Sequence, residues 1–198
     1  MAVTGRPREF DRAAALEAAM HLFWQKGFLA TSMNDLCEAM GIRSPSLYAA
    51  FKSKEALYLE AFDHYARSRG DTVWAALSQD GRARDAIVRL LQLNADAVLA
   101  SGDKPAGCMV SLGGVGDTWP EAVAHVAPQL RRDCLDALKT RLSTAVAEGE
   151  LPASTDVDRL GRFYIGMMQA MAVQAKDGAT RSDLMGLIDT AMTAWPAG

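Results

Sequence analysis

Apolar side chains recur every three or four residues along nearly the whole chain of 198 residues, which is the spacing of one face of an α-helix. We find no run of alternating apolar and polar residues long enough to predict a β-strand. Hydrophobic residues make up 49% of the chain, enough to bury a sizeable core. The sequence therefore predicts an all-α fold of about nine helices.

Capping residues place the most informative helices, which lie between positions 32 and 51. Ser32 is followed three residues later by Asp35, the pattern of a capping box, and Gly41 ends this first short helix. Ser44 is the predicted N-cap of a second short helix, with Pro45 at its first position. Two short helices joined by a three-residue turn have the spacing of a helix-turn-helix. The same spacing also fits a helical hairpin in any all-α protein.

A helix-turn-helix can place the start of its second helix at base edges in the major groove of DNA. Arg43, Ser44 and Ser46 stand at that leading end. A flexible arm that carries Arg6 and Arg8 precedes the first helix, and such basic arms can enter an A·T minor groove. The formal net charge of −3 argues against nonspecific coating of nucleic acid.

The remainder of the chain reads as longer helices, which divide the protein into two predicted domains, 1–53 and 54–198. Segment 118–146 contains Pro128, which must kink or split it, and 108–112 is predicted as one short helix. The last two helices, 156–176 and 181–195, carry more apolar surface than one small body can cover. We therefore expect a homodimer, with an interface that includes Leu184, Leu187, Ile188 and Ala191.

Several function classes are disfavoured by what the sequence lacks. It contains no apolar run long enough to span a membrane and no signal peptide, which predicts a cytoplasmic protein. The three cysteines and three histidines are too scattered to predict a metal site, and we expect no cofactor. No catalytic motif is recognisable, so an enzyme is not expected. A helical protein–protein adaptor stays as an alternative, although it gives no reason for the basic arm and the helix-turn-helix together.

The stretch from Phe23 to Leu57 resembles the N-terminal DNA-binding domain of TetR/AcrR-type transcriptional regulators. The matching motifs are Lys-Gly-Phe at 26–28, Thr-Ser-Met-x-Asp-Leu at 31–36, Gly-Ile at 41–42, Ser-Pro-Ser-Leu-Tyr at 44–48 and Phe-Lys-Ser-Lys-Glu-Ala-Leu at 51–57. This resemblance implies a repressor that binds a palindromic DNA operator as a homodimer. It also implies a C-terminal cavity under the fourth helix and release of DNA by a small-molecule inducer.

Carried over position by position, the resemblance gives each DNA-facing residue a role. Ser32, Tyr48 and Lys54 resemble contacts to backbone phosphates. The positions that resemble base-facing residues are Arg43, Ser44, Pro45, Ser46 and Ala49. Family members often carry a larger pair after the tyrosine, whereas Ala49 and Ala50 offer only methyl contacts, of a kind that suits thymine.

The ligand half is less constrained by its sequence. Methionine, aromatic and neighbouring side chains that could shape an adaptable pocket are Cys108, Met109, Trp119, His125, Phe163, Met167, Met168 and Met171. Each of them is also typical of an ordinary core. Gly-Cys segments similar to Gly107-Cys108 occur in electrophile-responsive members of the resembled family, so a thiol sensor at Cys108, with Lys176 as a candidate cationic neighbour, is an alternative. Cys37 and Cys134 are predicted to be packing residues.

Overall fold

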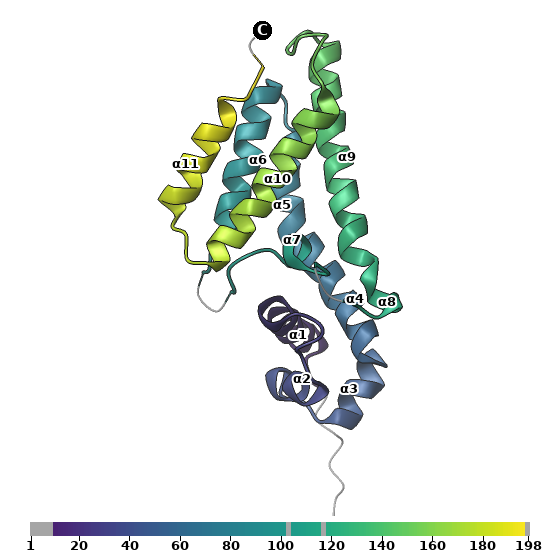
Figure 1. Ribbon diagram of the computed structural model, residues 1–198. Helices are drawn as coiled ribbons and strands as arrows, with labels where there is room; N and C mark the ends of the chain where they lie inside the picture. The colour runs from purple at the N-terminus through teal and green to yellow at the C-terminus, as the bar shows by residue number, and fades with distance from the viewer. Residues whose placement is uncertain (1–9, 102–103, 116–117, 197–198) are drawn as a thin grey trace, which may run out of the picture. The chain divides into compact units, whose positions relative to one another are not determined.

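The computed structural model describes residues 10–101, 104–115 and 118–196, and its regular elements there are helices without a strand (Figure 1). The all-α prediction is confirmed. Eleven α-helical segments are present in these ranges. If α4 with α5, and α8 with α9, are each counted as one interrupted helix, nine remain. Within the same ranges, no helix is both long enough and apolar enough to cross a membrane.

The contacts of the chain divide it into two compact units, Met1–His64 and Tyr65–Gly198. The helices of the first unit are α1 (Arg12–Lys26), α2 (Met33–Met40), α3 (Ser44–Phe51) and α4 (Lys54–Tyr65), whose last residue begins the second unit. Tyr58 of α4 packs edge-on against Phe23 and Phe28, with ring centroids 5.1 and 5.2 Å apart. The structural division therefore comes later than the predicted boundary at 53/54, because α4 supplies core residues to the first unit.

The second unit is a helical bundle with α6 at its centre. Its elements are the π-helical turn η1 (Ala66–Gly70), α5 (Asp71–Trp74), the 3-10 turn η2 (Ala75–Ser78), α6 (Ala83–Val98), α7 (Met109–Leu112), α8 (Glu121–Ala124), α9 (Val126–Ala147), α10 (Val157–Lys176) and α11 (Arg181–Met192). Helix α6 packs against α10, α11 and α9 (Figure 1). The bundle core therefore forms around α6.

The start of α3 and the start of α9 refine two local predictions. Ser44 is the first residue of α3 and not its N-cap, because the carbonyl of Arg43 already accepts from the backbone N–H groups of Ser46 and Leu47. The long segment with Pro128 is split at His125, which leaves Pro128 in the first turn of α9. A proline there costs no hydrogen bond, since the first turn has no intrahelical partners for its N–H groups.

The apolar stripe of α11 packs inside its own protomer. Leu184, Ile188 and Ala191 are buried in the core of the second unit, where α11 packs against α6, and Leu187 is half-buried. These four residues were predicted to face a second subunit. The stripe fits either location, because a helix face that covers a core and one that covers a partner have the same periodicity.

The buried hydroxyl group of Tyr164 leads to a prediction about stability. Its ring is fully buried, burial raises the pKa of its hydroxyl to about 12, and the hydroxyl oxygen has no hydrogen-bond partner in the described chain. Tyr164→Phe removes this unsatisfied group and keeps the ring, so we expect the free energy of unfolding to rise by about 1 kcal/mol in urea titrations.

Tyr65→Phe is the matched control, because Tyr65 is also buried but its hydroxyl is hydrogen-bonded to Cys108. That variant should lose about 1 kcal/mol of stability. A loss of the same size in Tyr164→Phe would contradict the prediction.

Candidate nucleic-acid interface and ligand pocket

A reciprocal pair of hydrogen bonds fixes the start of α2. The Ser32 hydroxyl accepts from the Asp35 backbone N–H at 3.1 Å, and the Asp35 carboxylate accepts from the Ser32 N–H at 2.8 Å. These bonds, together with Lys26 at 3.2 Å, lower the pKa of Asp35 to about 2. The predicted capping box is confirmed, so Ser32 has a fixed position at the exposed end of the helix.

The turn between α2 and α3 depends on the backbone conformation of Gly41. This glycine is left-handed, with φ 64° and ψ 26°, and its N–H donates to the Glu38 carbonyl at 3.1 Å. The reversal lets Leu36 of α2 and Leu47 of α3 be fully buried in the same unit. The two short helices therefore form a helix-turn-helix.

The predicted base-facing residues share the exposed side of α3. Leu47 and Phe51 are buried, whereas Tyr48 is 48% exposed. Tyr48 is the predicted phosphate contact of this helix, and the residues predicted to contact DNA bases are also exposed, namely Arg43, Ser44, Pro45, Ser46 and Ala49. One face of α3 is thus free to enter a groove, and the opposite face anchors it to the core.

The remaining basic residues that were predicted to contact DNA are Lys54 at the start of α4 and the two arginines of the N-terminal arm. Lys54 is half-buried, and its ammonium nitrogen lies over the Phe28 ring, 4.3 Å from the ring centroid. This burial lowers the pKa of Lys54. Its cation therefore also ties the start of α4 to the segment after α1. Arg6 and Arg8 lie outside the described residues.

Lys52 is a residue of this surface that sequence reasoning missed. It has φ 67° and ψ −55°, and the Ser53 N–H donates across it to the Phe51 carbonyl at 2.8 Å. Such a tight turn is strained for a residue with a Cβ. It joins α3 to α4 and leaves the Lys52 side chain exposed. No local signal predicts it, because lysine is not a typical turn residue.

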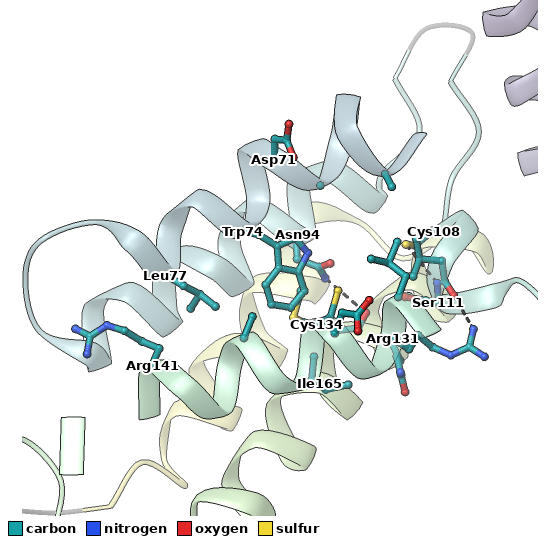
Figure 2. Close-up of a pocket in the computed structure, with 18 of the residues that line it drawn as sticks. Asp71, Trp74, Leu77, Asn94, Cys108, Ser111, Arg131, Cys134, Arg141 and Ile165 are labelled. Carbon is teal, nitrogen blue, oxygen red and sulfur yellow. Dashed lines mark hydrogen bonds between the residues drawn. The ribbon is translucent and has the colours of Figure 1, made fainter. Parts of the chain in front are cut away.

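The second unit contains a cavity of about 750 Å³, a volume suited to a small organic molecule. Its wall includes the apolar side chains of Trp74, Leu77, Ile165 and Met168 (Figure 2). Residues of η1 also line it. The described residues contain no group of three or more metal-ligating side chains placed to hold an ion.

Two of the eight predicted pocket residues, Cys108 and Met168, line this cavity. The other six lie elsewhere: Met109 and Met171 are buried in the protein, Met167 and Trp119 are half-buried, and Phe163 and His125 are exposed. The residue types in the sequence show which side chains are apolar. They do not show which helix faces surround a cavity, because that depends on tertiary packing. Trp74, Asn94 and Cys134 were missed for the same reason.

The two cysteines of the cavity differ in their surroundings. The Cys108 sulfur accepts from the Ser111 N–H at 3.4 Å and is hydrogen-bonded to Tyr65, whose pKa is raised, chiefly by burial. Burial also raises the pKa of the Cys134 thiol to about 12. Lys176, the predicted cationic neighbour of Cys108, has its Cβ close to the preceding residue Gly107. A Cβ added to Gly107 would lie 3.8 Å from the Lys176 Cβ.

Comparison with known proteins identifies the family and the fold of the chain. A family model described as bacterial regulatory proteins of the tetR family matches residues 15–61. The chain is 33% identical over 194 residues to the HTH-type transcriptional repressor ComR of Escherichia coli strain K12, covering 97% of this chain and 92% of the relative. The chain belongs to the TetR family. It is a transcriptional regulator and not an enzyme.

Two further relatives support this assignment to the TetR family. The HTH-type transcriptional repressor BdcR of the same strain is 38% identical over 120 residues, which cover 61% of this chain and 60% of the relative. A cysteine mutant of the TetR family transcriptional regulator CifR, solved with a 26 bp double-strand operator DNA, is 38% identical with a TM-score of 0.89. That match covers 97% of this chain and 100% of CifR, so it extends over both units.

The strained turn at Lys52 predicts that a glycine at this position stabilises the protein. Glycine adopts a positive φ without strain, so Lys52→Gly should raise the free energy of unfolding by about 1 kcal/mol in denaturant titrations. Lys52→Ala is the control, because it removes the same charge but keeps a Cβ. Equal stability of the two variants would show that the turn holds no strain.

Proposed function

We propose that the protein is a repressor that binds a palindromic operator as a homodimer and is released by a small molecule bound in the cavity of the second unit. The observation that carries this proposal is the exposed surface between Arg43 and Ala49 at the start of α3. The opposite face of α3 is buried, and α2 of the same helix-turn-helix begins with a capping box. The name of ComR as a repressor and the operator complex of CifR support it. Because its target is genomic DNA, we infer a cytoplasmic location.

Sequence readout in this proposal comes from the leading end of α3. The Arg43 guanidinium can donate two hydrogen bonds to a guanine edge, and the Ala49 methyl group can contact a thymine methyl. Tyr48 and Ser32 offer hydroxyl groups to phosphates, and Lys54 offers its ammonium group. The arm with Arg6 and Arg8 supplies further charge. Contacts to phosphates position the protein, whereas contacts to base edges discriminate sequence.

Direct binding to DNA from the neighbourhood of its own gene tests the function. The wild-type dimer should shift one fragment with an affinity that falls as salt rises, and unrelated DNA should not compete. Binding that is equal for all sequences would contradict a regulator with an operator.

Two substitutions separate positioning from readout. Tyr48→Phe should weaken binding to every sequence alike. Arg43→Ala should relax preference at one position per half-site by ~1–3 kcal/mol, as measured by competition with single-base variants of the operator. Arg82→Ala is the control, since it removes an exposed arginine from the second unit. A uniform loss of affinity in Arg43→Ala would place that residue on the phosphates instead.

The homodimer in this proposal uses the outer face of α10 with part of α11. Phe163 and Val173 are large hydrophobic side chains with 38% and 46% exposure. Met167 and Ala170 lie between them at helical spacing and are half-buried. Residues at these intervals share one face of a helix, so α10 presents an apolar stripe that a second copy can cover.

The double variant Phe163→Asp with Val173→Asp should therefore yield monomers by sedimentation and lose most of the operator affinity, because one half-site alone binds weakly. Val115→Asp, which changes another exposed apolar residue, is the control and should stay dimeric. A double variant that remains dimeric would exclude this face. Ile188→Asp would not distinguish the two faces, because Ile188 is buried and a charge at this position would disrupt the core.

Release by a noncovalent ligand is the primary proposal because the cavity has the volume to hold one. An electrophile or oxidant that modifies Cys108 is the alternative signal, since this thiol lines the same cavity. Either signal releases DNA only if it favours the DNA-free conformation of the protein. No observation on the described residues favours a protein–protein adaptor.

A further inference from the structure

Asn94 is an exception to the apolar pattern of α6. The neighbouring core positions of this helix are Ile87, Leu90, Leu91 and Val98, so its periodicity calls for an apolar side chain at 94. Asn94 is nevertheless only 7% exposed, and it lines the cavity. In Figure 2 its amide lies in the middle of the drawn side chains. The Asn94 amide therefore places a polar group in the cavity wall.

The hydrogen bonds of Asn94 leave this amide incompletely satisfied. Its Nδ2 donates to the Met168 carbonyl at 3.5 Å and to the Met171 sulfur at 4.0 Å, both of which are long. Its Oδ1 accepts no hydrogen bond within the described chain. This oxygen is therefore open to a hydrogen bond from a donor group of a ligand in the cavity.

Several charged residues also line the cavity. Arg67, Asp71 and Asp133 are exposed. The Arg131 guanidinium donates to two backbone carbonyls of residues 110 and 113. Arg141 Nη2 donates to the Gly81 carbonyl, its Nη1 is buried without a hydrogen-bond partner in the described chain, and in Figure 2 its guanidinium points away from Asn94. Asn94 is thus a buried neutral amide in a wall that also includes Trp74, Leu77 and Ile165.

We infer that the effector is an uncharged, mainly apolar small molecule with one hydroxyl or N–H group, which donates to Asn94 Oδ1 while its apolar body packs against Trp74 and Ile165. This inference rests on the proposed function, because it assigns a chemical class to the proposed ligand. It gives Asn94 the role of a specificity-determining residue.

Three probes of the same shape test this class on the DNA-free protein: para-phenylphenol, biphenyl and para-phenylbenzoate. A wholly apolar cavity would favour biphenyl, because the hydroxyl of the phenol loses its hydration without compensation. With Asn94 as acceptor, para-phenylphenol should bind at least about fivefold more tightly than biphenyl by calorimetric titration. The benzoate should bind most weakly, because its carboxylate accepts hydrogen bonds as Asn94 Oδ1 does and loses its hydration against the apolar wall.

Asn94→Leu should remove the preference for the phenol and bind biphenyl at least as tightly as the wild type does. Gln169→Leu is the matched control, since it removes another amide from the same cavity wall and should keep the preference. Asn94→Ala serves the same purpose if leucine disturbs folding, which circular dichroism and thermal unfolding will show.

Four outcomes would overturn the inference: tighter binding of biphenyl than of the phenol by the wild type, an unchanged preference in Asn94→Leu and Asn94→Ala, strongest binding of the benzoate, or no binding of any probe. Operator binding is measured without these probes. Failure of the inference is therefore distinguishable from failure of the proposed function.

Discussion

One run of consecutive helical segments, from Lys54 to Ser78, supplies residues to both the helix-turn-helix core and the cavity. Leu57 and Tyr58 are buried in the core that holds the helix-turn-helix, and Tyr65 and Trp74 line the cavity of the second unit. The π-helical turn at Ala66–Gly70 lies between them in sequence. Such turns are rare and frequently occur at functional sites. This segment is therefore the covalent link between the helix-turn-helix and the unit that contains the cavity.

The contacts of this run at its start and at Tyr65 define how a ligand could act. At its start, Lys54 lies over Phe28, and Ser53 caps the helix by accepting from the Ala56 N–H at 3.1 Å. At Tyr65, the hydroxyl is hydrogen-bonded to Cys108 on the cavity wall. A ligand that displaces Tyr65 or Trp74 changes the helical run itself. Regulation then requires only that the ligand bind one conformation of the run better than the other.

Local signals in the sequence predicted the helix-turn-helix well, because capping and turn chemistry act over three or four residues. The Ser32 and Asp35 capping box and the Gly41 turn are present as expected, and the Ser44 N-cap was wrong by one position. Tertiary packing set the remaining features. The apolar stripe of α11 covers its own core, and the cavity collects Trp74, Asn94 and Cys134 from elements far apart in sequence. A single sequence shows which residues are apolar but not which helix faces meet.

Reciprocal coupling between the two sites is the most direct test of regulation through the cavity. The binding of para-phenylphenol is measured on free protein and on protein saturated with the identified operator, and operator binding is measured with and without saturating phenol. Coupling predicts that the phenol binds the operator complex at least about fivefold more weakly and that operator affinity falls by the same factor, as linkage requires. Equal affinity of the phenol for free and operator-bound protein would contradict control of DNA binding by this cavity.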